Sequence, residues 1–171
     1  GATGVLGGAL AEGLAEAGAK VAVLGRNAER GEARVKSIQA KGGKAAFFSC
    51  DASSRCSLAE AHEKIEASLG APTILVNAAG TTAEQPVCGH SDELWDKIVD
   101  TNLTGAFRAT RAVLPGMIGR GWGRIVNIGS TAASVGWKDN PAYCASKAGL
   151  LGLTRQALNK RLVRGRQSSS H

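Results

Sequence analysis

The sequence has few aromatic residues, no long apolar run and no paired cysteines. Aromatic side chains make up 4% of the 171 residues, and no apolar segment approaches the roughly 20 residues that a membrane-spanning helix needs. The four cysteines include no C-x-x-C pair, and the histidines do not lie at metal-ligand spacing beside them. We therefore expect reduced thiols, a cytoplasmic protein, no metal site and no membrane segment.

Acidic residues are absent from the C-terminal end. From Arg155 onward there are five basic residues and no acidic one, so this end supplies most of the net charge of +7. Such a tail gives only weak, salt-sensitive binding to nucleic acid, and the three tryptophans are too widely spaced to form a stacking platform for bases. We predict that residues 159–171 are poorly ordered, and we expect no nucleic-acid partner.

Apolar strands alternate with amphipathic helices along the rest of the chain. The apolar spacing predicts strands at about 20–25, 45–49, 74–77 and 124–128, and helices at about 5–17, 28–40, 54–69 and 92–118. A further helix begins near Ala142. This alternation is typical of a three-layer, doubly wound parallel sheet of the α/β class. We predict a single domain over residues 1–158.

A glycine-rich segment directly precedes the first predicted helix. Gly1, Gly4 and Gly7 would let the backbone approach a pyrophosphate, whose charge is favoured at a helix N-terminus. A plain turn is the alternative. At the end of the next strand a carboxylate would favour NAD, whereas Arg26 and Asn27 offer donors for a 2′-phosphate. We therefore favour NADP over NAD, with a solvated strand end as the alternative.

Tyr143 and Lys147 lie four residues apart, so on a helix they share one face. A neighbouring cation stabilises a phenolate, the form that a general base requires. An ordinary surface pair is the alternative reading. Ser130 and Asn77 each end a predicted strand, at the carboxyl edge where doubly wound sheets bind ligands.

Taken in order, these motifs resemble the short-chain dehydrogenase/reductase (SDR) family, in its single-domain branch with a Rossmann-like fold. The resemblance covers Gly1 to Leu158. It rests on Gly1-x-x-x-x-x-Gly7, Asp51, Asn77-Ala-Ala-Gly80, Asn102-Leu-Thr-Gly105, Ser130 and Tyr143-x-x-x-Lys147.

The resemblance implies an NAD(P)-dependent oxidoreductase that transfers hydride between the nicotinamide and a CH–OH/C=O substrate, with Tyr143 as the general acid/base. Ser130 would hydrogen-bond the reacting oxygen, Lys147 would bind the nicotinamide ribose, and Asn102 would hold a water that links the lysine to solvent. A homodimer or homotetramer is implied for the complete protein. The other implied cofactor contacts are Gly1, Thr3, Gly4, Val5, Leu6, Gly7, Arg26, Asn27, Asp51 (to the adenine), Ala52, Asn77, Ala78, Ala79 and Gly80.

The sequence departs from the family pattern in two ways. Val5 stands where this branch has its middle glycine, and Gly4 instead gives the spacing of the extended, sugar-nucleotide-modifying branch. The family's first strand would precede Gly1 and further strands would follow Leu158, so we expect a chain truncated at both ends, with two unpaired strand edges facing each other. A catalytically inactive dinucleotide-binding remnant or scaffold is therefore the alternative function. Trp137, between Ser130 and Tyr143, is a candidate lining residue of the substrate pocket.

Overall fold

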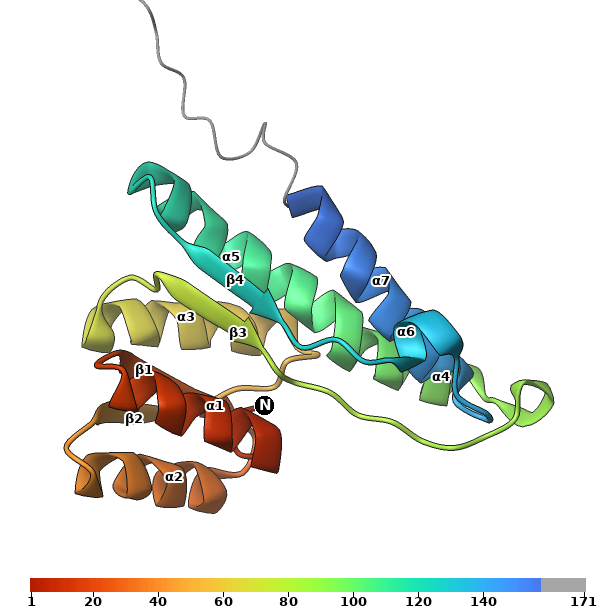
Figure 1. The fold of residues 1–171 in the computed structure, drawn as a ribbon, viewed down its shortest axis with the longest axis horizontal. Coiled ribbons are helices and arrows are strands. Elements are labelled where there is room, and N and C mark those ends of the chain that lie inside the picture. Colours follow the sequence, from red (N-terminus) through yellow and green to blue (C-terminus); the bar gives the residue numbers. More distant parts are fainter. Residues whose placement is uncertain (158–171) are drawn as a thin grey trace, which may run out of the picture.

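The computed structural model describes residues 1–157, and the predicted tail at 159–171 lies outside them (Figure 1). The first part of the chain contains α1 (Val5–Glu16), β1 (Lys20–Gly25), α2 (Ala28–Ala40), β2 (Lys44–Ser49), α3 (Arg55–Leu69) and β3 (Ile74–Asn77). The second part contains the 3₁₀ turn η1 (Val87–Gly89), α4 (Asp92–Val99), the π-helical turn η2 (Asp100–Thr104), α5 (Gly105–Gly119), β4 (Arg124–Asn127), α6 (Ala132–Val135) and α7 (Pro141–Ala157). The predicted alternation of strands and helices is confirmed.

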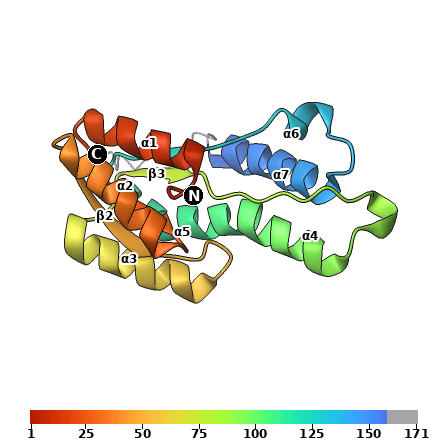
Figure 2. The same ribbon diagram turned by 90° about the horizontal axis from the view of Figure 1, so that it is seen from below.

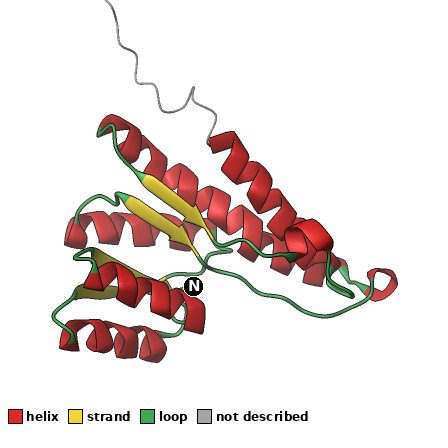
Figure 3. Ribbon diagram, in the orientation of Figure 1, coloured by secondary structure: helices red, strands yellow, loops and turns green. Residues whose placement is uncertain are grey.

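The strands form two parallel pairs (Figure 3). β1 pairs with β2 from Lys20↔Lys44 onward, and β3 pairs with β4 in a register that sets Asn77 opposite Asn127. Within the described residues β1 and β3 are not hydrogen-bonded to each other, so each presents an unpaired edge to the other pair.

Helices cover both sides of the strands. α1 and α2 pack against β1, while α3 packs against β1, β2 and α5, and α5 packs against β3. In Figure 2, β3 runs between α1 on one side and α3 and α5 on the other. The buried cluster beneath α1 and α2 is centred on Val23 and Ile38, which are almost fully buried. The three-layer α/β arrangement predicted from the sequence is therefore present.

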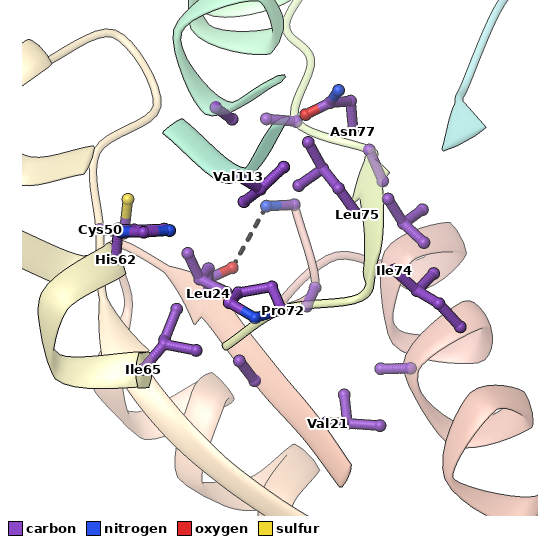
Figure 4. Close-up of a pocket in the computed structure, with 18 of the residues that line it drawn as sticks. Val21, Leu24, Cys50, His62, Ile65, Pro72, Ile74, Leu75, Asn77 and Val113 are labelled. Carbon is purple, nitrogen blue, oxygen red and sulfur yellow. Dashed lines mark hydrogen bonds between the residues drawn. The ribbon is translucent and has the colours of Figure 1, made fainter. Parts of the chain in front are cut away.

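A cavity of about 440 Å³ separates the two strand pairs (Figure 4). Its walls are mainly apolar and include Val21 and Leu24 of β1, Ile65 of α3, Leu75 of β3 and Val113 of α5. The first residues of the chain lie at one end of it, where the Ala2 N–H donates to the Leu24 carbonyl at 3.2 Å. The two pairs are therefore joined chiefly through the helices and loops around the cavity.

Two elements differ from the sequence prediction. The helix predicted over 92–118 contains the π-helical turn η2. The sequence does not predict this turn, because a short change from i→i+4 to i→i+5 hydrogen bonds hardly alters the spacing of apolar side chains. The short helix α6 was not predicted, since four residues are too few to show a helical period.

Candidate active site

The glycine loop is folded tightly against the strand ends. A Cβ at Gly7 would collide with the Gly1 carbonyl, and a Cβ at Gly1 would collide with the main chain at Ala78. The Gly4 N–H donates to the Gly1 carbonyl at 3.1 Å and closes the turn. Glycine is thus required at positions 1 and 7 by the fold itself.

Gly4, at the start of α1, is not required by close packing in the way that Gly1 and Gly7 are. A Cβ at Gly4 would meet only the Gly1 carbonyl oxygen, at an ordinary contact distance of 3.4 Å. α1 has no side-chain cap, and Val5 in its first turn is 91% exposed. α2, α3 and α4, in contrast, are capped by Asn27, Ser54 and Ser91. The first N–H groups of α1 therefore have no side-chain acceptor at a helix start that begins with a glycine, an arrangement that suits an anion.

The predicted ribose-reading residues at the end of β1 have unequal roles. The Asn27 side-chain oxygen accepts from the Arg30 N–H at 2.8 Å, so it is used to begin α2. Arg26 is exposed, and its charge is among the causes that lower the pKa of Asp51. Thr3 packs at the same end, where its side chain fills the space that a Cβ on Gly25 would need.

The loop after β2 places Asp51 at the same edge. One Asp51 oxygen accepts from the Ser53 hydroxyl at 2.7 Å and from the Ser53 N–H at 2.9 Å, and these bonds are the main cause of its lowered pKa. The Arg108 guanidinium on α5 donates to the Ser53 carbonyl at 2.6 Å. Close packing of Gly105 on Ala52 also holds this loop against the start of α5. Residue types alone do not predict the Arg108 contact, because its acceptor is a main-chain carbonyl.

Asn77 is engaged in the protein interior. Its amide donates to the Asn127 oxygen at 2.8 Å, and the Asn127 amide donates to the Thr154 hydroxyl on α7 at 2.9 Å. These bonds connect β3, β4 and α7, so the Asn77 side chain supports the strand ends. Asn127 and Thr154 were not singled out from the sequence, although asparagines ending two neighbouring strands are a recognisable signal.

The loop Ala78–Gly80 connects the glycine loop to the second half of the site. Gly1 packs on Ala78, and Gly80 lies beside the Asn102 side-chain oxygen and the Lys147 Nζ atom. The Asn102 oxygen accepts from the Thr81 N–H at 2.8 Å. The predicted residues Ala78 to Gly80 therefore lie between the glycine loop and the Asn102 and Lys147 side chains.

Lys147 is buried at the end of β4. Its Nζ donates to the Ile128 carbonyl at 2.7 Å, and burial lowers its pKa. Tyr143 lies one turn earlier on α7, with Nζ 5.7 Å from the centre of the tyrosine ring. Ser130 follows Ile128 by two residues, and its hydroxyl oxygen accepts from the Ala132 N–H at 3.1 Å at the start of α6, which packs against α7. Ser130, Tyr143 and Lys147 are therefore gathered at one strand end.

Asn102 is 1% exposed and all of its side-chain groups are engaged. Besides the bond from the Thr81 N–H, its amide donates to the Thr81 carbonyl at 2.9 Å and to the Ser146 hydroxyl at 3.1 Å. Ser146 in turn donates to the Tyr143 carbonyl at 2.8 Å. The asparagine of η2 is thereby linked to the helix that carries Tyr143, a role for Ser146 that the sequence did not reveal.

Other kinds of site find no support within residues 1–157. No group of three or more His, Cys, Asp or Glu side chains in that range could hold a metal ion, and its four cysteines are all free. Of the helices described, none is long and apolar enough to cross a bilayer.

The sequence of the chain is similar to that of known proteins. Residues 1–164 match the family described as short chain dehydrogenase. The sequence is 39% identical over 155 residues to a 3-oxoacyl-(acyl-carrier-protein) reductase of Pseudomonas aeruginosa, covering 91% of this chain and 63% of that protein. It is 36% identical to a D-threitol dehydrogenase of Mycolicibacterium smegmatis, covering 91% of this chain and 60% of that protein.

A solved structure shares the fold. A metagenomic short-chain oxidoreductase in complex with NADP superposes with a TM-score of 0.89 at 35% identity, covering 94% of this chain and 74% of the other. The chain spans about three-fifths of the length of the curated relatives that it matches.

Proposed function

The chain belongs to the short-chain dehydrogenase family, and from this premise we propose that it binds a nicotinamide dinucleotide and exchanges hydride with a CH–OH/C=O substrate, using Tyr143 as the general acid/base. The observation that carries the proposal is the gathering of Ser130, Tyr143 and Lys147 at the end of β4. There the Lys147 Nζ atom is held 2.7 Å from the Ile128 carbonyl.

The residues present fit the pyrophosphate of such a cofactor. The first N–H groups of α1 have no side-chain acceptor, and a Cβ at Gly4 would meet nothing nearer than the Gly1 carbonyl oxygen at 3.4 Å. The loop would place the pyrophosphate at these groups, where the helix dipole favours negative charge. Asp51 keeps one carboxylate oxygen free of Ser53 for the adenine, and Lys147 retains two of its three N–H donors for the ribose hydroxyls.

The protein's own chemistry is proton transfer at the substrate oxygen. A bound nicotinamide supplies or accepts the hydride at the substrate carbon. Tyr143 Oη gives a proton to the carbonyl oxygen in reduction and removes it in oxidation. Because Ser130 Oγ accepts from the Ala132 N–H, its own proton can be donated to the same oxygen. Lys147 lies beside the tyrosine, with its Nζ atom 5.7 Å from the centre of the Tyr143 ring.

NADP is the preferred cofactor in this proposal. Arg26 is exposed at the end of β1, where a guanidinium can form paired bonds to a 2′-phosphate. Positions 25 and 27 are glycine and asparagine, so neither carries the carboxylate that would accept a hydrogen bond from the ribose 2′-hydroxyl of NAD. The solved relative in complex with NADP is consistent with this choice.

The test first titrates the purified chain with NADPH and NADH to measure binding. It then measures turnover of small carbonyl compounds from the loss of absorbance of the reduced nicotinamide. Tyr143→Phe is the matched variant, because it keeps the ring and removes only the hydroxyl. We expect saturable binding in both proteins and turnover in the wild type alone. Equal turnover in the two proteins would refute the role of Tyr143.

One observation favours a second candidate, which is binding of the dinucleotide without catalysis. The glycine loop belongs to the β1–β2 pair and Tyr143 is attached to the β3–β4 pair, and the apolar cavity separates them. Reaction requires these two parts to be aligned to within a fraction of an ångström. Saturable NADPH binding with no turnover of any carbonyl compound would favour this candidate.

A further inference from the structure

Trp137 lies directly on the ring of Tyr143. The two ring centres are 5.6 Å apart and the planes are inclined by 26°, a stacked arrangement. The indole is nevertheless 48% exposed, so it covers the tyrosine ring and also presents a large apolar surface to solvent. The proposed acid/base is therefore in contact with an exposed aromatic surface.

The loop that carries Trp137 is held in one conformation. Gly136 and Asp139 both have positive φ, 69° and 56°, which makes the turn tight. The Gln85 N–H donates to the Asp139 carbonyl at 2.6 Å, and the Trp137 N–H donates to the Cys144 sulfur at 3.2 Å. Cys144 follows Tyr143, so the backbone of Trp137 is attached to the turn of α7 that carries the tyrosine.

Asn140, the residue after Asp139, is anchored by the same segment as Asp139. The Thr82 hydroxyl donates to the Asn140 side-chain oxygen at 2.6 Å, and Asn140 is buried. Thr82 belongs to the segment after β3, so bonds from two elements hold the loop. A surface fixed in this way contributes to binding without the entropy cost of ordering a mobile loop.

From this arrangement we infer that Trp137 determines specificity: its exposed surface packs against the substituent on the substrate's carbonyl carbon and favours a ring or other flat apolar group over a methyl group. The inference rests on the proposed function, because it takes Tyr143 Oη as the group that meets the substrate oxygen. Any substituent on the carbonyl carbon lies within two bonds of that oxygen, and the ring that carries Oη is stacked on the indole with the ring centres 5.6 Å apart. Covering about 50 Å² of apolar surface corresponds to roughly a tenfold preference.

The test compares kcat/KM for cyclohexanone and acetone with NADPH in the wild type, Trp137→Ala and Trp137→Phe. We expect the ratio of the two values to fall about tenfold in Trp137→Ala and to be largely kept in Trp137→Phe. Trp122→Ala is the control, because Trp122 is also 48% exposed but lies against Arg124. An unchanged ratio in Trp137→Ala, with acetone turnover retained, would overturn the inference.

A binding measurement separates this inference from the proposed reaction. The chain has three tryptophans, so Trp95→Phe together with Trp122→Phe leaves Trp137 as the one indole reporter. Titration with cyclohexanol is expected to give a saturable blue shift of its emission, and propan-2-ol a shift at least tenfold weaker in apparent affinity. Absence of turnover with a saturable cyclohexanol shift would reject the reaction and keep the role of Trp137. Equal or absent shifts with the two alcohols would reject the role of Trp137.

Discussion

Replacement of Asn102 by alanine should destabilise the fold more than loss of a polar side chain usually does. Asn102 is buried in η2 and forms three hydrogen bonds, two with the Thr81 main chain and one with the Ser146 hydroxyl. These bonds join the segment after β3 to α7. Alanine removes all three and leaves the Thr81 groups without these partners.

The size of the effect follows from the number of bonds. At a net contribution of about 1 kcal/mol for each hydrogen bond, the free energy of unfolding should fall by about 3 kcal/mol. Asn102→Asp keeps the acceptor for the Thr81 N–H but sets an oxygen against the Thr81 carbonyl. Burial favours the protonated form of this carboxyl, so the aspartate variant should regain stability as the pH falls and lose it as the pH rises.

Urea denaturation followed by far-ultraviolet circular dichroism measures these differences. Asn27→Ala is the matched control, because Asn27 is exposed and caps α2 with a single bond to the Arg30 N–H, so a loss of about 1 kcal/mol is expected there. A loss for Asn102→Ala no larger than that of Asn27→Ala would refute the reasoning.

Three further predictions concern the cofactor site and its charge. Arg26→Ala should lower the affinity for NADPH about tenfold or more and leave that for NADH nearly unchanged, as measured by the fluorescence of the reduced nicotinamide; equal losses for both would contradict the 2′-phosphate contact. Gly4→Ala should weaken NADPH binding without lowering the melting temperature, whereas Gly7→Ala should lower both, because only at Gly7 would a Cβ collide with the protein itself. Burial lowers the pKa of Lys147 in the folded state, so the unfolded chain binds the proton more tightly and the cost of burying the cation is fully present below the folded-state pKa. Lys147→Met should therefore resist urea better than the wild type at neutral pH, with an advantage that shrinks as the pH rises from the folded-state pKa toward the higher pKa of the unfolded chain. A constant advantage across that range would contradict the assignment.

The regular elements were predictable because their signals are local. The bounds of α2 and β3 agree with the sequence prediction, since a capping asparagine begins α2 and an apolar run followed by a polar residue defines β3. Tyr143 and Lys147 were placed on one helix by their spacing, and the structure confirms that both lie on α7.

The contacts that complete the site were not predictable from residue types. Lys147 is fixed by the carbonyl of Ile128, and Arg108 by that of Ser53, and a main-chain acceptor carries no side-chain signature. The sequence predicts Asn27 as a cofactor contact, and its side-chain oxygen in addition caps α2, a use that its place before a helix also indicates. The stacking of Trp137 on Tyr143 depends on a turn with positive φ at Asp139, a conformation that the residue type alone does not specify.

The cavity between β1 and β3 couples ligand affinity to the cohesion of the molecule. Gly1 to Gly7 belong with the β1–β2 pair, while Lys147 is attached to β4. A dinucleotide held at both ends, as proposed, would therefore act as a tie across the gap, and part of its binding free energy would be spent on fixing the two halves against each other. A substitution that loosens α3 against α5 should consequently weaken binding although it touches no ligand, and saturating ligand should raise the temperature at which the halves separate.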